Sequence, residues 1–307
     1  MNFETFSNVL YESTSEILPQ KLTAFNEASN YGLRLTTDGI GGDAIKSAMF
    51  AAIYDSQRRK TGTNNVVTPT ELKHQIESAP QVEGGFGPIH YLKSELDWIR
   101  LNEASAIQAI SSQMADAILR DQVNTGILAA TAAIGNQADT LTTYTAGAGS
   151  PTYLNINESH AKFGDMSDSI VVDIMDGTTY HQLLANNLQN ASNLFVSAGV
   201  LVVNILGKVV VKIDNPTLMA DGGILSLVTG GAVVQSGTLD TNMVRTNGRE
   251  NIESTLQADY NFKVGVKGCE FDKNIVRPSN AQLGTGTNWN RTVTHAKAGA
   301  GVYLKRA

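Results

Sequence analysis

The chain has 307 residues, of which 42% are hydrophobic and 17% charged, and its formal net charge is −6. This length supports a sizeable core, and the negative charge excludes binding of nucleic acid through overall basic character. The single cysteine, Cys269, excludes internal disulfides and a zinc site built from cysteines. The N-terminus lacks the features of a signal peptide, and the longest apolar run, 199–206, is too short for a membrane span. We therefore expect a soluble protein made in a reducing cytosol.

The first segment, residues 3–29, has apolar residues at helical spacing and predicts amphipathic helix. Pro19 is expected to divide this segment into two short helices, because proline lacks the N–H of a helical hydrogen bond. Such a segment needs a surface to lie on, either in its own subunit or in a neighbour.

Residues 31–91 form a more polar stretch, which we interpret as an extended arm. LRL predicts a short strand, SAMFAAIY and ELKHQIE predict short helices, and VEGGFGPIH predicts a loop. Long polar excursions between helices are usually functional. The expected tip carries Arg58, Arg59 and Lys60, which we interpret as contacts to a partner, because exposed charges steer and register such contacts.

The segment ASAIQAISSQMADAILRDQVNTGILAATAAIG, Ala104–Gly135, predicts one long helix that Asn102 caps and Gly135-Asn136 ends. The apolar stripe of its first half comprises Ile107, Ile110, Met114 and Ile118. The stripe of its second half is shifted by one position and comprises Leu119, Val123, Ile127, Ala130 and Ile134. One residue is about 100° of rotation, so the two halves are expected to pack against different surfaces. Asp116 and Arg120, on the outer side, are expected to form an ion pair.

From about residue 157 the sequence predicts a compact unit of helices and strands. Strands are expected for SIVVDIM, GKVVVKID and LQADYNFKVGVKGCEFD, a helix for TTYHQLLANNLQN, and a hairpin with a Gly230-Gly231 bend for GGILSLVTGGAVVQSG. The tail predicts a helical turn at 280–283 and a final strand, AGVYLKR. Helices and strands in mixed order with mainly hairpin links indicate an α+β fold.

No stretch carries a convincing catalytic, cofactor or metal motif. Gly39, Gly41 and Gly42 superficially resemble a dinucleotide loop, but the preceding strand is short and no βαβ unit follows. The five histidines lack the spacing of metal ligands, and Asp173 and Asp176 are interpreted as a strand and a turn residue. The sequence therefore predicts no catalytic residue, cofactor or metal.

Two lysine pairs, 208/212 and 263/267, have the i,i+4 spacing that places each pair on one face of a strand. No aromatic residues are interleaved with them, so they make a weak surface for nucleic acid. We expect both pairs on solvated strand edges, and His181 on the surface of its helix.

Several motifs, taken in order, resemble the major capsid protein of tailed phages with the Hong Kong 97-type fold. SIVVDIMDGTTYHQLLANNL resembles a strand, turn and TYxxLL-like helix of that family, and NILGKVVVKIDNP resembles the LGRRVVVDD strand that follows. ILSLVTGGAVV resembles the family's hairpin, while VGVKGCEFD keeps the glycine of the HPxGxxW strand but lacks its His, Pro and Trp. SNAQLGTGTNWNRTVTHAKAGAGVYLKR is similar to the ending NAELxxxxNWxRVxxxKxIxIVxL.

The resemblance covers nearly the whole chain. It implies an N-arm (1–32), an extended E-loop (33–92), a peripheral domain with the spine helix (93–156 and 270–307) and an axial domain (157–269). It also implies a non-enzymatic virion protein, whose hexamers and pentamers form an icosahedral shell around double-stranded DNA that is bound without sequence specificity. The implied partners are further copies, a scaffolding protein, a portal protein and, as a further candidate, a decoration protein, with no membrane. Because the sequence starts at the N-arm, we expect a separate scaffolding protein or prior removal of a scaffolding segment.

Three alternatives stay open. One is an encapsulin, a shell of the same fold that encloses an enzyme, and another is a tail or other structural subunit of a phage. The third is an α+β enzyme with an unrecognised site. Electron microscopy separates shells from an ordinary enzyme, and neighbouring portal and terminase genes separate a phage capsid from an encapsulin.

Overall fold

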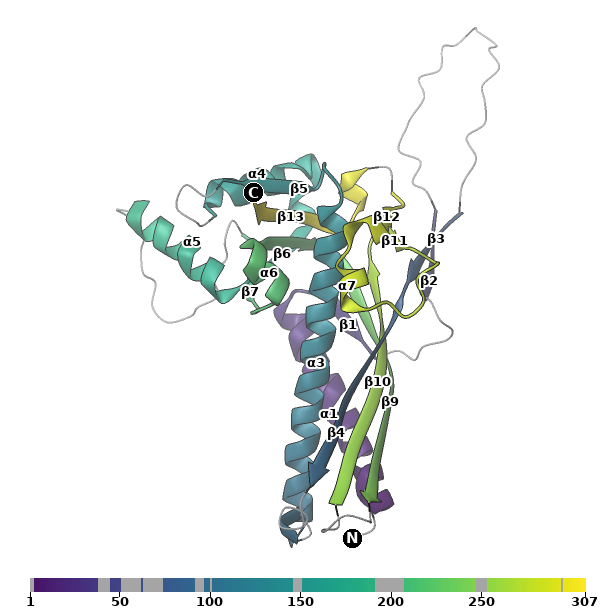
Figure 1. Ribbon diagram of the computed structural model, residues 1–307. Coiled ribbons are helices and arrows are strands. Elements are labelled where there is room, and N and C mark those ends of the chain that lie inside the picture. The colour runs from purple at the N-terminus through teal and green to yellow at the C-terminus, as the bar shows by residue number, and fades with distance from the viewer. Residues whose placement is uncertain are drawn as a thin grey trace.

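A computed structural model of the chain describes residues 3–37, 45–50, 62, 74–91, 97–99, 101–145, 151–190, 207–246, 253–293 and 295–307. In Figure 1 the molecule has a long lower part, where two helices run along a twisted sheet, and a broader upper part that extends to one side. The N-terminus lies at the lower end and the C-terminus lies in the upper part. The predicted elements therefore form an elongated subunit with a body at one end.

The N-terminal helix α1, Phe3–Ala28, is continuous, and Pro19 lies inside it. The predicted division at Pro19 is wrong. Proline removes one backbone hydrogen bond, but Leu18 and Leu22 on either side of it are buried in the main hydrophobic core. Most helix stability in proteins comes from packing of an apolar face, so this burial offsets the lost bond.

The second long helix, α3, spans Glu103–Gly135 and has 33 residues, which makes it about 50 Å long. It ends at the predicted position, where the Asn136 N–H donates to the Ala132 carbonyl. Asn102 stands at the N-cap position, but its side chain accepts no hydrogen bond from the helix and donates to the Trp98 carbonyl instead. The predicted helix is confirmed, and its predicted side-chain cap is wrong.

The lower sheet has the strand order β1-β9-β10-β4. Its strands are β1, Leu33–Thr36; β9, Ala232–Thr246; β10, Glu253–Val266; and β4, Gln81–Tyr91. β1 runs parallel to β9, and the other neighbours are antiparallel. The loop predicted for VEGGFGPIH is therefore wrong, since these residues form an edge strand. Their glycines gave no alternating pattern, and only pairing with β10 specifies the strand.

Within the stretch interpreted as an arm, β2, Ile45–Phe50, and β3, His74–Ala79, form a two-stranded antiparallel sheet. The short helices predicted for SAMFAAIY and ELKHQIE are wrong over these residues. Short apolar runs do not distinguish a helix from a strand, and here the partner strand decides. The residues of the glycine cluster at 39–42 and of the predicted tip, Arg58, Arg59 and Lys60, lie outside the described ranges.

The upper sheet has the order β5-β13-β8-β6-β7. Its strands are β5, Leu141–Tyr144; β13, Gly301–Arg306; β8, Ile224–Val228; β6, Ile170–Met175; and β7, Val209–Lys212. Helices of this part are α4, Tyr153–Ala161; α5, Gly177–Asn190; α6, Pro216–Asp221; and α7, Asn280–Leu283. The strands predicted for SIVVDIM, GKVVVKID and AGVYLKR and the helices predicted at TTYHQLLANNLQN and 280–283 are confirmed.

The hairpin predicted for GGILSLVTGGAVVQSG is wrong, because β8 and β9 belong to different sheets. The chain crosses between the sheets at Gly230-Gly231. Gly230 has a φ of +66°, and a Cβ on Gly231 would lie 2.4 Å from the Ala300 carbonyl oxygen. The glycines thus allow a close backbone approach at this crossing rather than a tight hairpin.

The two sheets and the helices make an α+β fold, as predicted. Residues 157–269 supply strands to both sheets, because β9 and β10 join the lower sheet and β6, β7 and β8 join the upper one. The proposed division into N-arm, E-loop, peripheral and axial segments stays a prediction. Like β2 and β3, β11, Cys269–Phe271, and β12, Trp289–Arg291, form a separate two-stranded sheet.

Candidate assembly surfaces

A buried polar cluster joins α4 to the upper sheet. The His160 Nε2 atom lies 3.0 Å from the Asp173 Oδ1 atom and 3.2 Å from the Ser226 Oγ atom. In a catalytic Ser-His-Asp triad the acid and the hydroxyl bond to different ring nitrogens, whereas both partners here meet the same nitrogen. All three side chains are also buried. This cluster therefore links three buried side chains of α4, β6 and β8 and lacks the geometry of a Ser-His-Asp triad.

The other residues considered for chemistry have structural roles. The Asp176 Oδ2 atom accepts hydrogen bonds from the backbone N–H groups of Thr178 and Thr179, so Asp176 caps the start of α5. His181 is exposed on α5, as predicted. Cys269 is buried in β11. Within the described ranges, no three His, Cys, Asp or Glu side chains are grouped as a metal site.

The expectation that both lysine pairs lie on solvated edges is wrong for Lys263, which is only 1% exposed. The reason is topological, since β10 is a central strand and Lys263 stands between Gln81 of β4 and Gln235 of β9. In the other pair, Lys208 donates to the Ser167 carbonyl, and Lys212 lies 4.6 Å from the centre of the Tyr180 ring. These lysines are committed to contacts within the subunit.

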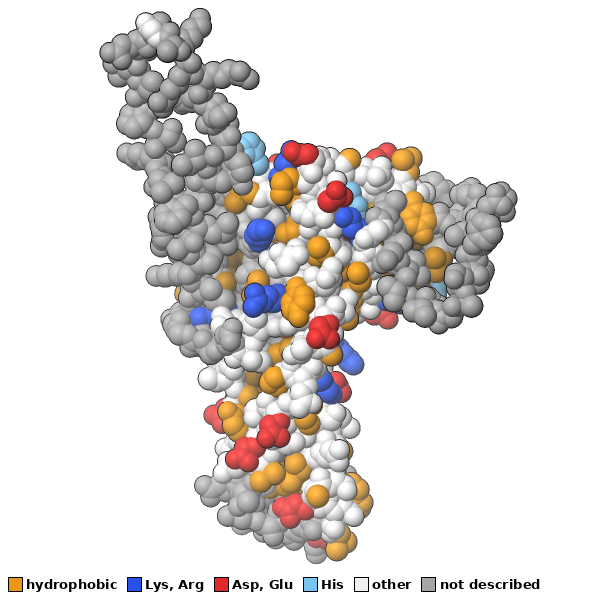
Figure 2. Space-filling model, turned by 180° about the vertical axis from the view of Figure 1, so that it is seen from behind, with side chains coloured by type: hydrophobic (Ala, Val, Ile, Leu, Met, Phe, Trp, Pro, Cys, Tyr) orange, Lys and Arg blue, Asp and Glu red, His pale blue; other side chains and the backbone are white. Residues whose placement is uncertain are grey.

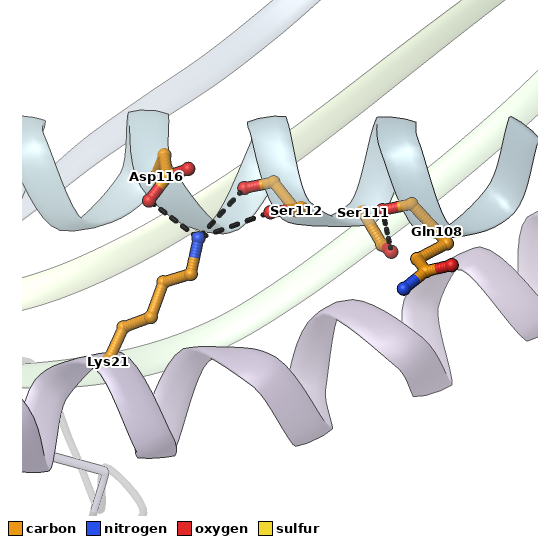
Figure 3. Close-up of polar contacts among 5 residues, drawn as sticks. All are labelled: Lys21, Gln108, Ser111, Ser112 and Asp116. Atoms are coloured by element: carbon orange, nitrogen blue, oxygen red, sulfur yellow. Dashed lines mark hydrogen bonds and ion pairs between the residues drawn. The ribbon is translucent and has the colours of Figure 1, made fainter. Parts of the chain in front are cut away.

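One side of α3 packs against α1, as Figure 3 shows. The Lys21 Nζ atom lies 2.6 Å from the Asp116 Oδ1 atom and donates to Ser112 at 3.3 Å. Deeper in this contact, the Ser13 and Ser111 hydroxyl oxygens are 3.0 Å apart. The predicted pair of Asp116 with Arg120 is wrong, because Asp116 faces the cation of α1 instead. The N-terminal helix therefore packs on the spine of its own subunit.

The two halves of α3 pack against different hydrophobic clusters, as the shifted stripe predicts. Met114, with Ile107 and Ile110 partly buried beside it, packs with Phe6 and Leu10 of α1. Ile118 and the apolar residues that follow it belong to the larger core, which contains strands of both sheets. The helix α3 thus runs without interruption from the lower part of the molecule into the upper part.

An apolar groove lies at the end of the molecule where α3 begins and β4 ends, the lower end in Figure 1. Its volume is about 540 Å³, and we call it the arm-end groove. It is lined by Ile89, His90, Tyr91, Trp98, Ile99, Ala106, Ala109 and Ile110. Trp98 is 56% exposed, Ile89 45%, and the nearby Leu101 84%. Contiguous exposed apolar surface of this kind marks sites of protein interaction.

Residues 2–303 match the family model described as Gp13-like, major capsid protein 13-like. The chain belongs to this family of major capsid proteins. The prediction of a major capsid protein is confirmed, and this capsid protein is a structural component of the virion. No curated protein sequence matches it. None of the helices in the described part of the capsid protein has the length and hydropathy of a membrane span.

Solved phage structures share the architecture of this capsid protein at low sequence identity. A chain from Mycobacterium phage Adephagia is 8% identical, with a TM-score of 0.51 and coverage of 89% of this chain and 88% of that chain. A chain from the acid-stable capsid of Helicobacter pylori bacteriophage KHP30 is 12% identical, with a TM-score of 0.51 and coverage of 91% and 88%. At such identities the likeness concerns the fold, which is the Hong Kong 97-type capsid fold.

Proposed function

We propose that copies of this capsid protein assemble as hexamers and pentamers into an icosahedral shell that encloses double-stranded DNA. The match of residues 2–303 to a major capsid family is the observation that carries this proposal. The elongated shape of the subunit supports this proposal, because an extended subunit with an exposed apolar end can contact several neighbouring subunits in a shell. Among the described residues, the cluster of His160, Asp173 and Ser226 has the residue types of a catalytic triad. It is buried and has the wrong geometry for one, which supports a role without catalysis.

The segments of the chain are assigned roles within this proposal. Residues 1–32 form the N-arm, 33–92 the E-loop, 93–156 with 270–307 the peripheral domain, and 157–269 the axial domain. The paired strands β2 and β3 both lie within the proposed E-loop. Arg58, Arg59 and Lys60 are proposed as contacts of this arm to a neighbouring subunit, because a run of cations registers an interface.

The cargo and the partners follow from the same proposal. The net charge of −6 disfavours tight adhesion of DNA to the shell wall, which suits cargo that is packed without sequence specificity. Further copies, a scaffolding protein and a portal protein are the proposed partners, with a decoration protein as a further candidate. Synthesis is proposed to take place in the host cytoplasm.

Electron microscopy of the expressed protein, alone and together with the proposed scaffolding protein, tests the proposal. Closed shells of uniform size are expected in at least the second preparation. A subunit that stays monomeric in both, or that forms only open tubes, refutes the proposal. Shells isolated from infected cells that hold an enzyme in place of DNA establish the encapsulin alternative.

A further inference from the structure

A buried histidine and a buried aspartate face each other between α4 and the upper sheet. His160 is 6% exposed and Asp173 is 0% exposed, and the Nε2 and Oδ1 atoms that join them are 3.0 Å apart. Ser226, which stands beside Asp173 on the neighbouring strand β8, lies 3.2 Å from the same nitrogen. The second oxygen of the carboxyl group, Asp173 Oδ2, is buried and has no hydrogen-bond partner among the described residues. Within the described chain, this fully buried carboxyl group therefore depends on the His160 ring.

The residues next to this pair are apolar. Ile156 lies one helical turn before His160 on α4, Phe163 follows the end of α4, and both are buried. Val302 of β13 is the register partner of Ser226, and it packs with Phe163 in one hydrophobic cluster of the upper part. A charge in such surroundings loses its hydration, so it is strongly disfavoured unless an opposite charge balances it.

Among the described residues, no third titratable side chain takes part in this contact. The elements packed against α4 and β6 include β5, β7, β8, β13 and the 3₁₀ helix η1, Gly164–Ser169. Together with α4, β6 and the residues that follow these two elements, they carry Tyr144, Tyr153, Glu158, Lys162, Asp165, Asp168, Asp176, Lys212, Lys305 and Arg306. Within the described chain, none of these groups forms a hydrogen bond or ion pair with His160 or Asp173. Figure 2 shows acidic and basic side chains close together on the surface of the upper part, where water screens their charges. The charge of the pair therefore depends mainly on its own two members.

The pair has three charge states, which differ in the number of titratable protons that it holds. With two protons it carries a positive charge, and with none it carries a negative charge. With one proton it is neutral overall, whether that proton is on the imidazole or on the carboxyl group. Because both charged states place an unbalanced charge among apolar side chains, the folded protein favours the state with one proton. His160 lies in the last turn of α4, where the helix dipole favours a cation, so the neutral state is expected to be an ion pair.

The unfolded chain holds a different number of these protons. In an unfolded chain aspartate ionises at about pH 3.9 and histidine loses its charge at about pH 6.5, so above the second value neither group keeps its titratable proton. Folding then takes up one proton, and the state that binds more protons gains stability as the pH falls. The contribution of the pair is therefore fully present between about pH 4 and pH 6.5 and declines as the pH rises further. It also declines below about pH 4, where the unfolded chain holds both protons.

We propose that His160 and Asp173 share a single proton and that this proton holds α4 on the upper sheet, so that an alkaline solution loosens the contact. The contact joins the end of α4 to β6, and Ser226 adds β8 to it. Above about pH 6.5, each unit of pH is expected to lower the equilibrium constant for folding by about tenfold through this pair. A single subunit takes up the proton, so the effect does not depend on assembly into a shell.

Urea unfolding of the full-length, unassembled chain between about pH 6.5 and about pH 8.5 tests the proposal. The native chain is compared with Asp173→Asn, which keeps the size and one acceptor oxygen of the side chain but removes its titration. The folding constant of the native chain, divided by that of the variant, is expected to fall by about 100-fold over these two units of pH. Cys269 and the histidines are present in both chains, so their own titrations cancel in this ratio. The matched control is His181→Gln, which removes an exposed histidine of α5 and should give a ratio that does not change with pH.

A ratio for Asp173→Asn that stays constant with pH, or that changes no more than the ratio for His181→Gln, overturns the shared proton. If Asp173→Asn does not fold, hydrogen exchange of the native chain decides the question. After correction for the intrinsic rate of exchange, the protection of the α4 amides, residues 153–161, is expected to fall by about tenfold per unit of pH above about pH 6.5. Protection of α4 that is the same at both ends of the pH range also overturns the proposal.

Discussion

The substitution Ile118→Asp tests the role of the spine helix most directly. Ile118 is 1% exposed and lies where the apolar stripe of α3 shifts, inside the larger core. Loss of a buried isoleucine side chain costs about 2–5 kcal/mol. A buried polar group without a partner adds about 1–3 kcal/mol. The combined loss approaches the whole stability of a typical domain, which is about 5–15 kcal/mol, so we expect an unfolded or aggregated subunit.

Circular dichroism melting and the soluble fraction of the unassembled subunit measure this effect. Two variants serve as controls. Ile118→Val keeps an apolar side chain and should cost about 0.5–1.5 kcal/mol, and Arg120→Asp adds a carboxylate at an exposed position of the same helix and should change little. If Ile118→Asp melts at the temperature of the unsubstituted chain, the packing assigned to α3 is wrong.

Three further perturbations test other parts of the subunit. Deletion of residues 55–65 should leave a folded, soluble subunit that forms no stable shells, because the arm tip is expected to contact neighbours; normal particles in the microscope would contradict this role. Gly126→Leu should lower the unfolding free energy by about 1–3 kcal/mol, because a Cβ at this position would already lie 2.9 Å from a side-chain carbon of Val234. Denaturant unfolding measures this change, and a curve that matches that of the native chain would show that α3 and the sheet separate easily. Burial, and then the hydrogen bond that Tyr260 donates to Asp121 at 2.7 Å, raise the pKa of Tyr260. The folded state therefore favours the protonated phenol, and its contribution to stability is present below the unfolded pKa of about 10 and declines as the pH rises beyond it; a Tyr260→Phe variant whose alkaline melting profile matches that of the native chain would exclude this cause.

Elements with long or regular patterns were predictable from the sequence. The one-residue shift in the apolar stripe of α3 predicted two packing surfaces, and two hydrophobic clusters lie there. The continuous apolar run of β6 and the strong helical pattern of α5 are likewise present. Such signals are local, because a residue's neighbours along the chain already decide which of its faces is buried.

The predictions from the sequence were wrong where a segment distant in the chain decides the local conformation. Pro19 stays inside one helix because its flanking leucines reach the core, and β4 is a strand only because β10 pairs with it. Lys263 is buried because its strand lies between two others, which spacing along the chain does not reveal. In each case tertiary contacts outweigh a local preference of about 1 to 3 kcal/mol.

The α+β class and the spine helix are encoded in local patterns of the sequence, and its ordered motifs indicate the capsid family. The position of the exposed apolar surface, in contrast, depends on tertiary contacts. The arm-end groove forms where the end of β4 meets the start of α3. Whether a residue is exposed, and which residues lie beside it, is a property of the folded chain, because both depend on which elements distant in the sequence pack over that residue.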